Sequence, residues 1–174
     1  MARQPFKSGF TLIELIVTIA VAAILIGIAI PSFRNLIVSN RLNTISTEMV
    51  SAISFARSES VKRNSPIVLC RAASSTATAC ASGDEWTHWV ILSGSDVIRR
   101  GEINSHNSTI RVSSDLTNDQ VVFAGDGLAR TGGNIINESE ISVCSTVGPS
   151  ESIREVTFGA ASRISTNRVT GTCS

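Results

Sequence analysis

An apolar run near the N-terminus, from Phe10 to Ile30, constrains this chain more than any other feature. It reads FTLIELIVTIAVAAILIGIAI, and Glu14 is its only charged residue. A helix of about 21 residues is roughly 31 Å long, enough to cross the hydrocarbon core of a bilayer. The preceding segment carries Arg3 and Lys7. These charges predict a cytoplasmic N-terminus, with the body of the chain on the other side of the membrane.

Three simpler interpretations of this run compete: a secretory signal peptide, a plain membrane anchor and a buried core helix. A signal peptide normally has an apolar region of about 7 to 15 residues that ends at a small-residue cleavage site. This run is longer and contains a carboxylate near its start. A core helix in a small domain is rarely apolar on all sides over such a length. Composition alone therefore favours an anchor or a signal.

The residues at the start of the run are more specific. Gly9 is followed by FTLIE, from Phe10 to Glu14, and this junction resembles the cleavage signal of type IV prepilins and type II secretion pseudopilins. The resemblance implies that a prepilin peptidase cuts after Gly9. It also implies that Phe10 becomes the first residue of the mature protein and is methylated on its amine.

Glu14 has a physical cost that calls for a partner. A lone carboxylate within a membrane helix costs about 2.5 to 3.5 kcal/mol on insertion scales. The resemblance implies that Glu14 pairs with the free amine of Phe10 in a neighbouring subunit, which offsets desolvation and sets the axial register of a filament. The alternative is a protonated or snorkelling glutamate near the membrane surface.

The pattern changes after residue 30. Apolar residues now recur at steps of three and four, which predicts an amphipathic helix with one buried stripe. Lys62 and Arg63 make its last turn basic, and Pro66 blocks its continuation. Joined to the apolar run, this segment predicts one helix of about 50 residues, bent at Pro31. The expected stripe consists of Val38, Leu42, Ile45, Met49, Ala52, Ile53 and Ala56.

Short apolar runs separated by glycine-containing turns dominate residues 66–174, a pattern typical of antiparallel strands in hairpins. The expected fold class is α+β, in which a long N-terminal helix packs its amphipathic half on a small antiparallel sheet. Strands are expected at 66–71, 86–92, 96–100, 108–113, 120–124, 140–144 and 154–158. The chain then divides into a leader (1–9), an apolar transmembrane or filament-core helix (10–30), an amphipathic helix (31–65) and a β-rich head (66–174).

The head also carries a resemblance. A strand ending in cysteine, IVLC, is followed ten residues later by Cys80 and then by the run WTHWVIL, an order similar to that of the H-type pseudopilins and FimT/FimU minor pilins. The resemblance implies a structural subunit that primes pilus assembly and links tip minor pilins to the major pilin. It also implies an inner-membrane stage before assembly into an extracellular pilus. Two alternatives stay open: a DNA-binding competence pilin and a pseudopilin of a type II secretion system, in a periplasmic pseudopilus.

Four cysteines form an even set behind an export signal, so disulfides are the expected chemistry. We favour Cys70 with Cys80, which closes a short loop, and Cys144 with Cys173, which ties down the C-terminal tail. Zinc is the rival interpretation, but the sequence has no C-x-x-C spacing.

The near-neutral net charge of the chain and its lack of catalytic sequence motifs limit the other functions that can be expected. The chain has 15 basic and 14 acidic residues, and removal of Arg3 and Lys7 with the leader leaves 15 − 2 = 13 basic ones. No overall positive field for nucleic acid remains. The resemblance to FimT-type pilins, some of which bind DNA through basic residues in the C-terminal region, makes Arg154, Arg163 and Arg168 candidates for DNA contact, together with the Arg99-Arg100 pair. No nucleophile elbow, phosphate loop or H-E-x-x-H motif occurs, so no enzymatic activity, cofactor or metal is expected.

Overall fold

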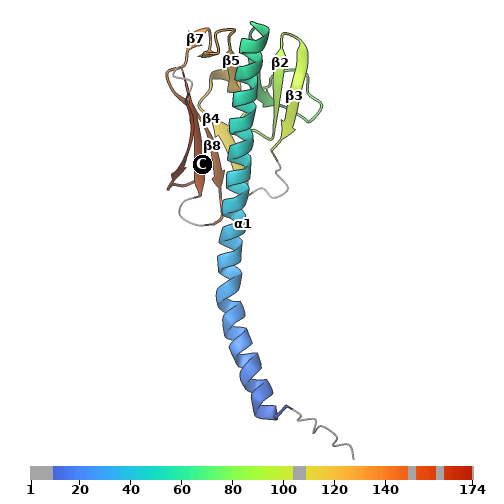
Figure 1. Cartoon of the computed structure of the whole chain (residues 1–174), viewed down its shortest axis with the longest axis vertical. Helices are drawn as coiled ribbons and strands as arrows, with labels where there is room; N and C mark the ends of the chain where they lie inside the picture. The colour runs from blue at the N-terminus through green and yellow to red at the C-terminus, as the bar shows by residue number, and fades with distance from the viewer. Residues whose placement is uncertain (1–9, 104–108, 149–151, 160–162, 174) are drawn as a thin grey trace, which may run out of the picture. The chain divides into compact units, whose positions relative to one another are not determined.

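The computed structural model describes residues 10–103, 109–148, 152–159 and 163–173, without the side chain at position 31. The predicted leader, residues 1–9, lies outside the described residues. One helix, α1 (Leu12–Arg63), precedes the strands, and a short 3₁₀ turn (Thr117–Asp119) lies among them (Figure 1). The strands are β1 (Ile67–Ala72), β2 (His88–Ser93), β3 (Asp96–Glu102), β4 (Ile110–Ser114), β5 (Gln120–Phe123), β6 (Ala129–Thr131), β7 (Asn134–Ile135), β8 (Ser139–Ser145), β9 (Ile153–Phe158) and β10 (Ile164–Val169).

The chain forms two compact units that divide between Ile37 and Val38. The helix α1 continues through Pro31. The bend that the sequence predicts at this proline stays a prediction. At its other end α1 stops at Asn64, whose φ of 48° lies in the left-handed region that commonly ends helices. Lys62 and Arg63 both contact Glu59 one turn earlier, so the basic last turn is part of an ion-pair cluster.

The strands form two antiparallel sheets, whereas the sequence suggested a single small one. Sheet A has the order β3-β2-β1-β5-β6-β7, and sheet B has the order β10-β9-β8-β4. Figure 1 shows the second part of α1, from Val38 onward, between the two sheets, with β2 and β3 on one side and β4 and β8 on the other. The main-chain N–H of Trp86 donates to the carbonyl of Val112 at 2.7 Å, which joins the segment before β2 to β4. The α+β fold class is confirmed, and β6, β7 and β10 are additions to the predicted strands.

The predicted stripe of α1 is the centre of the core. Leu42, Met49, Ile53 and Ala56 are fully buried, and Val38 is half-buried at the edge of the cluster. Side chains from the inner faces of both sheets complete the same cluster, among them Leu69, Ile91, Val121, Ile141 and Val156. Each fully buried aliphatic side chain contributes about 1.5 to 3 kcal/mol relative to an exposed one, so α1 is the main element that holds the two sheets together.

Both tryptophans are buried, and each satisfies its indole N–H with a carboxylate. Trp86 Nε1 donates to Asp119 Oδ1 and Trp89 Nε1 donates to Glu48 Oε1, both at 3.0 Å. The Trp89 ring lies over Gly101 of the neighbouring strand, where a Cβ would come within 2.1 Å of the ring. Glycine is therefore required at position 101 for this packing. A buried indole without an acceptor would leave a costly unpaired donor.

A second, smaller cluster lies on the other face of sheet A, beneath the loop that the Cys70–Cys80 disulfide closes. Arg71 donates to the carbonyls of Ala81, Ser82 and Glu85, which holds the segment that follows the loop. The cluster consists of Cys70, Ala72, Val90 and Leu92, with Val68, Ala77, Cys80 and Val97 packed against it. The disulfide loop is therefore a cover for apolar surface.

We expect the double substitution Cys70→Ser, Cys80→Ser to lower the free energy of unfolding by about 3 kcal/mol, because it removes a cross-link across 10 residues and uncovers the second cluster. Urea unfolding of the full chain in detergent, followed by tryptophan fluorescence, measures the change. The matched control is Cys144→Ser, Cys173→Ser, which removes a cross-link across 29 residues without uncovering that cluster. Hydrophobic-dye binding should rise only in the first variant, and an equal rise in both would contradict the covering role.

Candidate functional site

The first part of α1, from Leu12 to Ile30, has an apolar surface on every side. All the described side chains between residues 10 and 37 are exposed. Phe10 is 83% exposed, and the large aliphatic residues that follow are about half exposed or more. The helix is long and apolar enough to cross a membrane by length and composition. Such a surface is stable only when lipid or other apolar helices cover it.

Glu14 lies in the first turn of this helix and takes part in a capping box. The Glu14 N–H donates to Thr11 Oγ1 at 3.3 Å, and the Thr11 N–H donates to Glu14 Oε2 at 3.5 Å. Both contacts are long, so the carboxylate is weakly held. Its position at the N-terminal end of α1 also places it at the positive end of the helix dipole. The Glu14 carboxylate therefore points toward the end of the chain where cleavage after Gly9 would create a new amine.

Sequence reasoning used Glu14 but missed Thr11. The signal was readable, because a threonine followed three residues later by a glutamate before an apolar run is the sequence pattern of a capping box. Gly9 lies outside the described residues. Phe10 is described and lies just before the helix, with its side chain exposed. Cleavage and methylation at this pair stay predictions.

The three arginines proposed for DNA contact do not form one surface. Arg154 is only 2% exposed, and its guanidinium donates to Asn43 Oδ1 at 2.8 Å and to Ser39 Oγ at 3.2 Å, which ties β9 to α1. Its burial excludes it from contact with a phosphate backbone. Arg168 is exposed on β10 directly opposite Arg154, and Arg163 lies just before β10.

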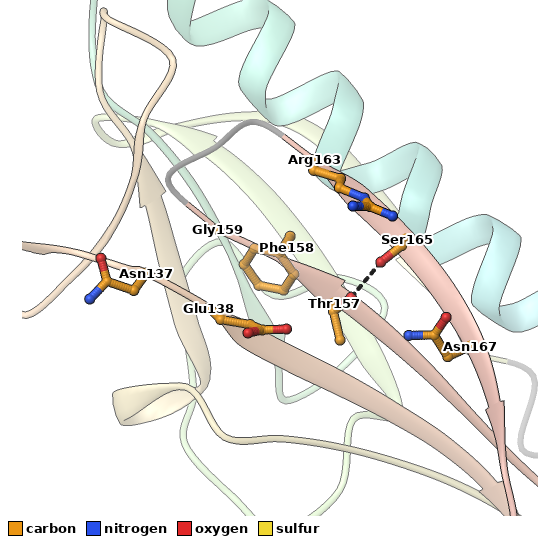
Figure 2. Close-up of a pocket in the computed structure, with 8 residues that line it drawn as sticks. All are labelled: Asn137, Glu138, Thr157, Phe158, Gly159, Arg163, Ser165 and Asn167. Carbon is orange, nitrogen blue, oxygen red and sulfur yellow. Dashed lines mark hydrogen bonds between the residues drawn. The ribbon is translucent and has the colours of Figure 1, made fainter.

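A polar hollow of about 370 Å³ lies near the start of β10 (Figure 2). Thr157 and Ser165, opposite each other on β9 and β10, share a hydrogen bond of 2.7 Å within it. Figure 2 shows Glu138 near Thr157, while Arg163 lies at the far side. The lining is completed by Asn137, Phe158, Gly159 and Asn167. The two hydroxyls bond each other, and Phe158 is buried, so the hollow contains neither an activated nucleophile nor an exposed aromatic ring that could stack a base or sugar.

Acidic side chains gather around β8 beside this hollow. Burial raises the pKa of Glu140, and the negative charges of Glu155, Asp115 and Glu138 raise it further. The Glu140 main-chain N–H donates to Asp115 Oδ1 at 2.9 Å, so the two residues are held together. Glu138 and Arg163 line the same hollow, so this negative potential weakens the case for a phosphate ligand at Arg163.

The cysteines pair as favoured from the sequence, Cys70 with Cys80 and Cys144 with Cys173, with no free thiol among the described residues. The second disulfide ties the segment after β10 to the end of β8. Within the described ranges, no group of three or more histidine, cysteine, aspartate or glutamate side chains has a geometry that would hold a metal ion.

Comparisons with known proteins agree with this arrangement. Residues 46–168 match the family model described as type II transport protein GspH, and residues 6–30 match the prokaryotic N-terminal methylation motif. No curated protein matches the chain by sequence. Two crystal forms of the type IV minor pilin FimU from Pseudomonas aeruginosa are similar in fold, with TM-scores of 0.54 and 0.51 and 16% identity. The matches cover 74% and 72% of this chain and 90% and 91% of those chains.

We expect Glu140→Gln to stabilise the head at neutral pH. Because the pKa of Glu140 is raised in the folded state, its ionised carboxylate opposes folding. The contribution of Glu140 to stability is therefore fully present below the pKa of the unfolded chain, and it is lost as the pH rises through the higher pKa of the folded chain. The variant should therefore unfold at a higher temperature than the native chain at pH 7, and the difference should vanish below about pH 4. Glu102→Gln, on the exposed edge of β3, is the control. A gain of the same size at pH 3 and pH 7 would contradict the electrostatic cause.

Proposed function

The chain belongs to the family described as type II transport protein GspH and carries the N-terminal methylation motif, and from this premise we propose that it is a minor type IV pilin. Its role would be to prime pilus assembly and to link the tip minor pilins to the major pilin. Membership of this family implies contact with other pilins and processing by a prepilin peptidase. The proposal assigns no enzymatic activity to the chain and no cofactor.

The observation that carries the proposal is the exposed apolar surface of α1 from Leu12 to Ile37. Transfer of apolar surface out of water contributes about 25 cal/mol per Å², so this segment is driven into an apolar environment. Before assembly that environment would be the inner membrane, with the head on the periplasmic side. After assembly it would be the other apolar helices of a filament.

Glu14 supplies the second argument. Its carboxylate is held only by the long contacts of the capping box, at the end of α1 where the mature N-terminus would begin. The ammonium group of a neighbouring subunit's first residue would be a stronger partner than the Thr11 N–H, because both groups are charged. Replacement of the weak contact between Glu14 and Thr11 by this ion pair would favour the assembled filament. It would also fix the axial position of each subunit relative to its neighbour.

We expect Glu14→Leu to reduce incorporation into pili by more than about tenfold, because it leaves a neighbour's ammonium without a counter-charge in an apolar surrounding. The measurement is the amount of the protein in sheared pili relative to the membrane fraction. Mass spectrometry should still find a mature chain that begins at Phe10. Thr18→Ala, which removes an exposed hydroxyl from the same helix, is the matched control. Undiminished incorporation of Glu14→Leu would refute the pairing.

A second candidate function is a pseudopilin of a type II secretion system, which the match to the GspH family model favours. Deletion of the gene separates the two functions. Loss of surface pili and twitching with intact protein export supports the pilus role, whereas loss of export with intact pili supports the secretion role. DNA capture, the third possibility, has less support, because Arg154 is buried and Arg163 lines a hollow that also contains Glu138.

A further inference from the structure

The two sheets have four outer edges, and three of them are protected against pairing with another strand. Edge strands with charged side chains, with very short length or with covering segments resist such pairing. β7 has only two residues, and the main chain of β4 accepts a hydrogen bond from Trp86. β3 is protected by charge, since Asp96, Arg99, Arg100 and Glu102 lie along it.

β10 is the exception. It has six residues, ISTNRV, of which only Arg168 is charged, and it pairs with β9 along its whole length. Alternate residues of a strand direct their N–H and C=O groups to opposite sides, so about half of these groups point away from β9. No hydrogen bond joins them to any other described residue. The disulfide between Cys173 and Cys144 holds the end of this segment in place.

Two hollows lie along α1 beside this edge. One, of about 550 Å³, is bounded by Ile164 of β10 and, on α1, by Ser54, Arg57, Ser58, Val61 and Lys62. The other, of about 400 Å³, is bounded by Asn43 and Thr47 together with Asn40 and Thr44. These helix positions are separated by steps of three, four and seven, so both hollows lie on one side of α1.

Asn43 locates the second hollow relative to β10. It accepts a hydrogen bond from Arg154, which lies directly opposite Arg168 in the β9–β10 pair. The first hollow is therefore next to the start of β10, and the second is near its end. An added strand would follow the edge from one hollow to the other. Its inward side chains would lie over α1, where Thr47, Ser54 and Ser58 are short and where Arg57 and Lys62 also line the first hollow.

We propose that the β10 edge accepts an extended segment of a neighbouring pilin subunit as an added antiparallel strand. The unpaired main-chain groups favour a strand over a helix, because a helix has no free N–H or C=O groups to offer along its length. A second copy of this chain is a poorer occupant, since two β10 edges paired about a two-fold axis would close at two subunits. The inference rests on the proposed role as a filament subunit and names a contact for it.

The side chains of β10 define the chemistry of that segment. Ile164, Thr166 and Arg168 share one face of the strand, the face toward α1, because their partners on β9 are Phe158, Val156 and Arg154. In an antiparallel partner, the residue opposite Arg168 comes four positions before the residue opposite Ile164. An acidic side chain at the first position and an aliphatic one at the second would complement this face. The partner segment therefore has the pattern acidic-x-x-x-aliphatic within a run of β-forming residues.

The test uses the full chain in detergent micelles and a fluorescent seven-residue peptide, acetyl-Thr-Glu-Thr-Thr-Thr-Ile-Thr-amide. Fluorescence anisotropy should show saturable binding. Two further peptides are N-methylated at either the odd or the even positions, which removes hydrogen-bond donors from one edge only. Strand addition predicts that one of the two binds more weakly by about tenfold or more, and that the other binds like the parent. Equal binding by both, or no binding of the parent peptide, would overturn the proposal.

A charge exchange tests the register. Arg168→Glu should weaken binding of the parent peptide by about fivefold. A peptide with arginine in place of its glutamate should restore it. Arg99→Glu, on the β3 edge, is the control and should leave binding unchanged. Self-association of the full chain that Arg168→Glu abolishes, without any peptide binding, would assign the edge to a second copy and overturn the proposal. Failure here leaves the Glu14 incorporation experiment intact, because that experiment reports on α1 alone.

Discussion

The head depends on burial of one face of α1 between two sheets. Residues from Leu42 to Ala56 meet the inner faces of sheets A and B in a single cluster, and the described main-chain link between the sheets is the bond from Trp86 to Val112. Polar contacts then fix the position of the helix against each sheet. Glu48 accepts from Trp89 of sheet A, and Asn43 accepts from Arg154 of sheet B. Apolar burial supplies most of the stabilisation, and these paired polar groups set the register.

The same helix is apolar on all sides up to Ile30, apart from Glu14 and Thr18, whereas the part after Ile37 is amphipathic. The stripe from Leu42 to Ala56 is buried within the head, whereas the described side chains of residues 10–30 are exposed. This division explains why a fold that is complete in the head still requires a membrane or other subunits. A lone carboxylate at Glu14 is costly in apolar surroundings, which is the physical basis of its proposed pairing with the amine of a neighbouring subunit.

Several half-buried polar side chains of the head hold its loops in place. Asp119 accepts hydrogen bonds from Gly83, Trp86 and Ser114, and Arg71 donates to three main-chain carbonyls in the segment after the disulfide loop. These groups are satisfied by their own chain and are not poised for catalysis. Among the described residues, we propose two surfaces for contact between subunits: the exposed apolar part of α1 up to Ile30 and the outer edge of β10.

The sequence alone determined the long helix, its apolar and amphipathic parts, the buried stripe and the strands whose side chains alternate between core and solvent. These features follow from local periodicity, which a single chain segment records. Tertiary structure alone decided the rest. β10 lies at an exposed edge and therefore has no apolar alternation, so its sequence carried no strand signal. Arg154 looked like a surface cation, but its partners Ser39 and Asn43 are more than a hundred residues away, and only the folded chain brings them to it.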